Sequence, residues 1–195
     1  MNIELNNVTK AFSQKGYVLN SGVYRLNVFG IRASGGATNT FNDIIGSVHL
    51  DYAGVWNVVT YIGTTDPGTY WLQNPPNVTG TAILMEGQHV DAFKIGLHKG
   101  QYRALVQNRP LPVYRDNNKD SQYGCDPSTT ETGNFGINLH HAGIDSKFIN
   151  NWSAGCQIIA NLASFNDFMG LVDLNVQNGH GEIFTYTLFK EEDIA

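Results

Sequence analysis

The sequence predicts a mainly β fold, a β-rich α+β protein in which a compact sheet sandwich or barrel carries one or two short helices. Short segments rich in β-branched and aromatic residues recur along most of the chain, separated by glycine or polar turns. The 195 residues include 21 glycines, which suits close loops between strands. Helical periodicity is confined to one segment near the C-terminus.

The predicted strands follow one another from residue 23 onward, and turn sequences such as Asp66-Pro67-Gly68 lie between them. They cover residues 23–31, 46–54, 55–63, 80–87, 92–98, 103–107, 111–116 and, as a closing strand, 182–190.

The one predicted helix covers residues 163–174. Ser164 stands at a capping position and Asp167 follows three residues later, which is a capping-box spacing. Apolar side chains then recur at helical spacing and predict a face packed in the core. They are Phe165, Phe168, Met169 and Val172.

The composition predicts one folded domain, because 42% of residues are hydrophobic and only 15% are charged. Residues 1–20 are polar, and we expect them to form a loose arm or to pack on a neighbour. Residues 21–195 would form a single domain, with no internal repeat and no linker.

Charge and hydropathy exclude some classes of partner. The net charge is −5 and no basic cluster occurs, so nucleic acid is a poor candidate. No apolar run reaches the length of a membrane span. The N-terminus lacks the features of a signal peptide, so we expect synthesis in a cytoplasm. Reducing synthesis favours free thiols at Cys125 and Cys156.

Residues 137–159, INLHHAGIDSKFINNWSAGCQII, carry the candidate chemistry. Alternation over 135–140 predicts a strand that presents Asn138 and His140 on one face. The following loop returns the chain at Cys156, whose thiol becomes a nucleophile when a neighbouring base holds it as thiolate. Ala154 and Gly155 let the backbone approach a substrate carbonyl, so that the Gly155 and Cys156 amides form an oxyanion hole.

The sequence places a histidine, a loop and then Ser-x-Gly-Cys in this order. This pattern resembles the catalytic motif of the L,D-transpeptidase family (YkuD type). The stretch TTDPGTYWL at 64–72 is similar to a turn that precedes the site in that family. The resemblance covers roughly residues 60–160 and implies a mostly β fold. It also implies a cysteine that attacks peptide bonds in the stem peptides of peptidoglycan, by hydrolysis or transpeptidation.

Carried over by position, the resemblance makes Cys156 the nucleophile and His140 the base, with the carbonyl of His141 orienting the base. His141 is the alternative base. Ser153 would tie down the loop by hydrogen bonds. The family usually has a histidine at the position of Ala154 and an arginine at that of Ile158, and both are missing here.

Other residues are candidates for binding the substrate, and no metal or cofactor is expected. They are Trp152, which could wall the cleft, Tyr70 or its neighbour Trp71 after the Asp-Pro-Gly turn, Asn138, Gln157 and Arg115, which could reach a carboxylate. Because adjacent strand residues point to opposite faces, His140 and His141 are unsuited to share one metal ion with Cys156.

The predicted function is therefore that of a cysteine peptidase or acyl-transferase acting on the cell wall, which a phage particle, a secretion device or lysis would deliver. The alternative is a phage- or secretion-associated structural or wall-binding module that keeps the fold without the chemistry. A third interpretation of Cys156 is a small buried apolar side chain.

Overall fold

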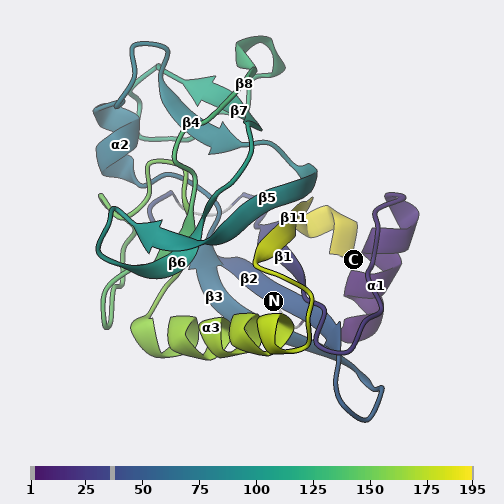
Figure 1. Cartoon of the computed structure of the whole chain (residues 1–195). Coiled ribbons are helices and arrows are strands. Elements are labelled where there is room, and N and C mark those ends of the chain that lie inside the picture. Colours follow the sequence, from purple (N-terminus) through teal and green to yellow (C-terminus); the bar gives the residue numbers. More distant parts are fainter. Residues whose placement is uncertain (1–2, 36–37, 195) are drawn as a thin grey trace.

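The structure, a computed structural model, describes residues 3–35 and 38–194. Within these residues, eight strands close into a barrel, three more form a small separate sheet, and three α-helices lie around them (Figure 1). The predicted mainly β fold is confirmed, although the helices exceed the one or two expected.

Around the barrel the strand order is β1-β11-β5-β6-β9-β10-β3-β2, and the small sheet has the order β4-β7-β8. The bounds of the barrel strands are β1 Asn27–Arg32, β2 Asp43–Leu50, β3 Trp56–Thr64, β5 Gly87–His98, β6 Tyr102–Gln107, β9 Leu139–His141, β10 Gln157–Ile159 and β11 Ile183–Lys190. Those of the small sheet are β4 Thr81–Leu84, β7 Leu111–Asp116 and β8 Glu131–Gly133. The helices are α1 Leu5–Gln14, α2 Thr69–Gln73 and α3 Leu162–Gln177.

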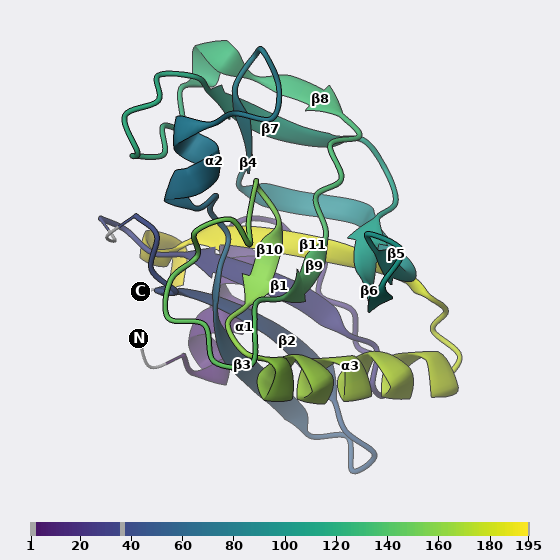
Figure 2. The ribbon, with the colours of Figure 1, turned by 90° about the vertical axis from the view of Figure 1, so that its left-hand side faces the viewer.

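Two parallel pairs make the barrel mixed. β1 pairs with β11, and β9 pairs with β10. The other neighbours are antiparallel. Figure 2 shows β9 and β10 side by side, with α2 above them and α3 below.

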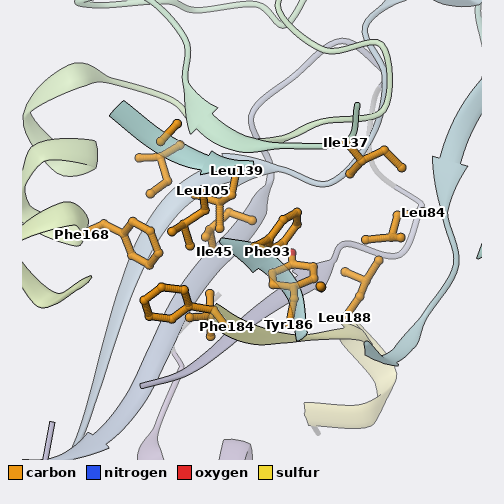
Figure 3. Packing of buried hydrophobic residues seen from close by; sticks show 14 of the residues in the cluster. Ile45, Leu84, Phe93, Leu105, Ile137, Leu139, Phe168, Phe184, Tyr186 and Leu188 are labelled. Carbon is orange, nitrogen blue, oxygen red and sulfur yellow. The ribbon is translucent and has the colours of Figure 1, made fainter. Parts of the chain in front are cut away.

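The main core fills the barrel and continues under α3 (Figure 3). The predicted helical face is confirmed, because its four apolar side chains are all buried. The cap differs: Asn161 accepts a hydrogen bond from the Ser164 amide, and α3 begins two residues before Ser164. Asp167 instead accepts a 2.6 Å hydrogen bond from the Tyr61 hydroxyl.

The expectation of a loose polar arm over residues 1–20 is wrong for most of that segment, and residues 1–2 lie outside the described residues. Helix α1 buries Val8, Ala11 and Phe12, which contribute to a second core on the outer side of the barrel. The Phe12 ring meets Phe189 edge to face, with 5.1 Å between centroids. Together with the partly buried Leu5, the three buried residues of α1 recur at helical spacing and form the apolar face that docks a helix whose other positions are polar.

The small sheet and α2 cover the end of the barrel at which the candidate site lies (Figure 2). The Asp66-Pro67-Gly68 turn joins β3 to α2, and the Gly68 amide donates a 2.9 Å hydrogen bond to the Ser153 carbonyl. A Cβ at Gly68 would lie 2.0 Å from the Asn150 carbonyl oxygen, so only glycine allows this contact. The two stretches that carry the family resemblance are thus packed against each other.

Candidate active site

Strands β9 and β10 bring Cys156 and His140 to one face. Ile158 lies in register with His140 and Gln157 with Leu139, so Cys156 stands beside Asn138 at the start of the pair. The predicted strand over residues 135–140 is shorter in the structure, since β9 begins at Leu139; Asn138 and Cys156 directly precede β9 and β10. The Gln157 amide donates a 2.8 Å hydrogen bond to the Asn138 carbonyl, so the pairing reaches these two residues and alternation places them on the face of His140. The strand spacings place the Cα atoms of Cys156 and His140 about 8 Å apart.

Ser153 fixes the turn that presents Cys156, in agreement with its predicted role. Its fully buried hydroxyl accepts a 3.1 Å hydrogen bond from the Gly155 amide and donates one of 2.9 Å to the Cys156 carbonyl. Gly155 has φ +116°, and a Cβ there would lie 2.4 Å from the Ala82 carbonyl oxygen. Glycine at this position therefore serves close packing on β4.

The predicted oxyanion hole changes as a result. The Gly155 amide is turned inward to Ser153, so it is not available to a substrate in this state. The Cys156 amide has no hydrogen-bond partner within residues 3–35 and 38–194. Of the two predicted donors, Cys156 is the one left free.

The Cys156 thiol is half-buried and lies between two backbone groups. It donates to the Gly136 carbonyl and accepts from the Asn138 amide, each at 3.5 Å. Burial raises the pKa of the thiol, against smaller lowering effects of the Asn138 amide and the Lys99 charge. The resting group is therefore a neutral thiol, with an amide already aimed at the sulfur.

His140 is almost fully buried, and its orientation fixes its tautomer. Nδ1 lies 2.8 Å from the His141 carbonyl, which can only accept, so Nδ1 carries the proton. The other ring nitrogen, Nε2, is buried without a hydrogen-bond partner among the described residues. Burial lowers the pKa of His140 to about 3, with a further contribution from His98. A neutral imidazole with a free lone pair has the protonation state of a general base, although a pKa of about 3 makes it a weaker base than one that titrates near the operating pH.

His141 contributes its backbone, as predicted from the resemblance, while its side chain points elsewhere. The ring packs against Tyr102 at 4.4 Å and Phe165 at 5.1 Å between centroids. Its Nδ1 contacts the Ala142 carbonyl. Strand alternation separates the two histidines, which favours His140 as the base.

The cleft has two adjoining compartments. One, of about 360 Å³, contains Cys156 between Trp71, Phe135 and Trp152. The other, of about 210 Å³, contains His140 and Tyr102. Trp152 lines both compartments, in agreement with its predicted role as a wall.

The aromatic residue that lines the cleft after the Asp-Pro-Gly turn is Trp71, not Tyr70. Tyr70 is half-exposed and packs edge to face on Trp71, outside the lining. The Trp71 indole donates a 2.9 Å hydrogen bond to the Asn151 carbonyl, which turns its ring toward the thiol loop.

Two further predictions of substrate contact are wrong. Gln157 is fully buried and accepts a 2.8 Å hydrogen bond from the Tyr186 hydroxyl, because alternation turns it away from Cys156 into the barrel. Arg115 lies on β7, ion-paired with Glu131 at 2.7 Å and stacked 4.4 Å from the Phe135 ring. Its role is to hold a wall of the cleft rather than to reach into it.

Asn138 does line the cleft, and it introduces a residue that sequence reasoning missed. Its side-chain oxygen accepts from the Gln107 amide, so its NH₂ group faces His98 and donates to Nδ1 at 3.0 Å. The His98 ring stacks on His140 with 3.8 Å between centroids and 23° between planes. Burial lowers the pKa of His98 to about 4.

Lys99 and Tyr102 were missed as well. Both belong to the hairpin that joins β5 and β6, and Lys99 lines both compartments. The Tyr102 hydroxyl lies 3.2 Å from His140 Nδ1. Nothing local in the sequence links this hairpin to residues 138–156; only its strand-Lys-Gly-strand pattern marked it as a turn.

A second cavity of about 370 Å³ lies elsewhere and is lined by Arg32, Glu86 and Cys125. There the guanidinium of Arg32 is already ion-paired with Asp66 at 2.7 Å and Glu86 at 2.6 Å. Burial raises the pKa of the Cys125 thiol to about 11. Among the described residues that line this cavity none is a histidine, so the thiol has no imidazole base there.

Both cysteines are free. Over residues 3–35 and 38–194, no group of three or more His, Cys, Asp or Glu side chains is placed to hold a metal ion. Within the same residues, no helix has the length and apolar character needed to cross a bilayer. Comparison with protein-family models, with curated proteins and with solved structures finds no match to this chain.

Proposed function

We propose that the protein is a cysteine peptidase or acyl-transferase that acts on the stem peptides of peptidoglycan, as its resemblance to the L,D-transpeptidase family implies. The observation that carries the proposal is the state of His140. Its Nδ1 faces the His141 carbonyl at 2.8 Å, and its buried Nε2 has no partner among the described residues. The thiol of Cys156 lies on the same strand face, in a cleft large enough for a peptide.

In the proposed mechanism, His140 Nε2 takes the proton of Cys156 as the sulfur attacks the carbonyl carbon. Because both groups are neutral at rest, proton transfer accompanies the attack rather than preceding it. The free Cys156 amide donates to the developing oxyanion. The leaving amine takes the proton from His140, and water or a second amine then releases the acyl group from sulfur.

The direct test incubates the protein with purified muropeptides and follows mass changes. We expect activity that Cys156→Ala abolishes, His140→Gln reduces by about 10²–10⁴-fold, and Cys125→Ala leaves intact. Activity that survives Cys156→Ala would contradict the mechanism. Since the substrate lies in the cell wall, the proposal also requires that the protein reaches the wall.

One observation favours the second candidate, a wall-binding module without catalysis. The thiol is held by the Gly136 carbonyl and the Asn138 amide, and burial raises its pKa. If this candidate is correct, muropeptides bind without any change in mass, and Cys156→Ala binds them as well as the original protein.

A further inference from the structure

The turn between β5 and β6 has a backbone that suits Gly100 but not Lys99. Lys99 has φ +49° and Gly100 has φ +72°, and the Gln101 amide donates to the His98 carbonyl at 2.9 Å. Two central residues with positive φ define a type I′ turn, which prefers asparagine or glycine at the first of them. A lysine there is unfavourable for the turn, so its side chain is not chosen for the backbone conformation.

Lys99 is exposed and forms no ion pair within the described part of the chain. No Asp or Glu lies within ion-pair distance of its ammonium among residues 3–35 and 38–194. Of the described residues that line the two compartments of the cleft, none is acidic. The lysine therefore places an uncompensated positive charge at the cleft, and this charge lowers the pKa of Cys156 against the larger effect of burial.

His98 adds a hydrogen-bond donor beside that charge. Its Nδ1 accepts from Asn138, so the proton of the neutral ring is on Nε2. Nε2 has no partner among the described residues, and His98 lines both compartments. An N–H donor next to an ammonium, with no acid nearby, is a combination suited to a carboxylate.

We propose that His98 and Lys99 form an anion-binding subsite beside Cys156, which selects substrates that carry a free carboxylate next to the bond attacked. The inference rests on the proposed function and specifies its substrate. The family that the sequence resembles usually has a histidine at the position of Ala154 and an arginine at that of Ile158. Lys99 supplies a positive charge from the turn between β5 and β6 in place of these two residues. The aromatic walls Trp71 and Trp152 would flank the chain that bears the carboxylate.

Alkylation of Cys156 by two reagents of nearly equal shape tests the subsite without any enzyme assay. Iodoacetate and iodoacetamide both form an S–C bond as the thiolate displaces iodide, but only iodoacetate carries a carboxylate. At one pH both rates depend on the same fraction of thiolate, so this fraction cancels in their ratio. The ratio therefore measures how strongly the cleft favours the negatively charged reagent over the neutral one. Peptide mass spectrometry separates Cys156 from Cys125.

Lys99→Asn removes the charge and gives the turn a residue that it prefers, so the variant should unfold at the same urea concentration as the original protein or a higher one. We expect the iodoacetate-to-iodoacetamide ratio at Cys156 to fall about fivefold, as for one partly exposed charge contact. Added salt should lower the ratio in the original protein and much less in the variant.

Lys119→Asn is the matched control. Lys119 also has a left-handed backbone, φ +61°, and lies outside both compartments. A ratio that Lys99→Asn leaves unchanged, or that both variants lower equally, would overturn the subsite.

A second measurement uses the proposed reaction. A stem peptide that ends in a carboxylate should have a lower KM than the same peptide ending in a carboxamide, and Lys99→Asn should remove the difference. Equal KM values in the original protein would overturn the subsite while leaving the enzyme proposal intact. If no peptide is turned over, the proposed function fails, whereas the alkylation ratio still decides the subsite.

Discussion

Replacing Ser153 with alanine tests whether the turn before Cys156 is held as the structure describes. The hydroxyl bonds both the Gly155 amide and the Cys156 carbonyl, and the side chain is fully buried. Its removal leaves a buried amide and a partly buried carbonyl without this partner. At about 1–3 kcal/mol for the amide and somewhat less for the carbonyl, we expect a loss of about 2–4 kcal/mol in the free energy of unfolding.

The assay is urea unfolding at pH 7, followed by tryptophan fluorescence. A domain stable by about 5–15 kcal/mol would remain folded after this loss, so the alkylation of Cys156 can be measured in the same variant. Released from Ser153, the Gly155 amide can rotate and the thiol loses its fixed position. We therefore expect the selectivity between Cys156 and Cys125 to change together with the stability.

Ser146→Ala is the matched control, because that hydroxyl accepts one hydrogen bond, from the Gly143 amide at 2.8 Å, in a more open loop. We expect less than about 1 kcal/mol there. A loss in Ser153→Ala no larger than in the control, with unchanged alkylation of Cys156, would refute the role of Ser153 in holding the turn.

Three further predictions concern protonation and the barrel interior. Burial raises the pKa of Cys156 and lowers that of His140. The rate at which iodoacetamide alkylates Cys156 should therefore be low at pH 7 and should increase through the alkaline range. A high rate that is already constant below about pH 7 would instead indicate a thiolate–imidazolium pair. The pKa of His140 is about 3 in the folded protein and about 6.5 in the unfolded chain. Between pH 6.5 and pH 3 the unfolded chain therefore binds more protons at this residue than the folded protein does, and the folded protein loses stability as the pH falls through this range. Between pH 7 and pH 4 these values correspond to a loss of about 3 kcal/mol in the free energy of unfolding, which His140→Gln should remove. Urea unfolding at the two pH values measures it, and an equal loss in both proteins would contradict the prediction. Gln157→Leu leaves the buried Tyr186 hydroxyl without its acceptor and should lower stability by about 1–3 kcal/mol with muropeptide affinity unchanged, whereas a selective loss of affinity would restore Gln157 to the substrate site.

Strand positions could be predicted because alternation is a local property. β7 occupies the predicted residues 111–116, and the closing strand was expected one residue before β11 begins. Closure of the barrel depends on contacts that local patterns do not contain. The parallel pairing of Val28 with Tyr186 joins residues far apart in the chain, and no periodicity distinguishes it from other pairings.

In the candidate site, too, local features could be predicted and long-range contacts could not. The stretch from Asn138 to Cys156 was predicted because its base, loop and thiol follow one another in the chain. Lys99 and His98 were not, because they reach the cleft through a hairpin some forty residues earlier. Gln157 was wrongly predicted to bind the substrate because it follows Cys156 in the sequence. Neighbouring residues of a strand point to opposite faces, so alternation alone would have placed Gln157 on the face opposite to Cys156.

The Ser-x-Gly-Cys pattern is weaker support for catalysis than it first appears from the sequence, because its Ser and Gly have architectural reasons. Ser153 satisfies two backbone groups, and Gly155 avoids a clash with Ala82, so a non-catalytic relative would need both. The informative features are those for which the fold offers no reason. The unpartnered Nε2 of His140, the free amide of Cys156 and the unfavourable backbone of Lys99 each bring a local disadvantage. Unpartnered buried atoms and left-handed residues also occur elsewhere, at Ser47 and Lys119 for example, but these three occur at one cleft. Their convergence, rather than the motif, is the physical argument for chemistry at this site.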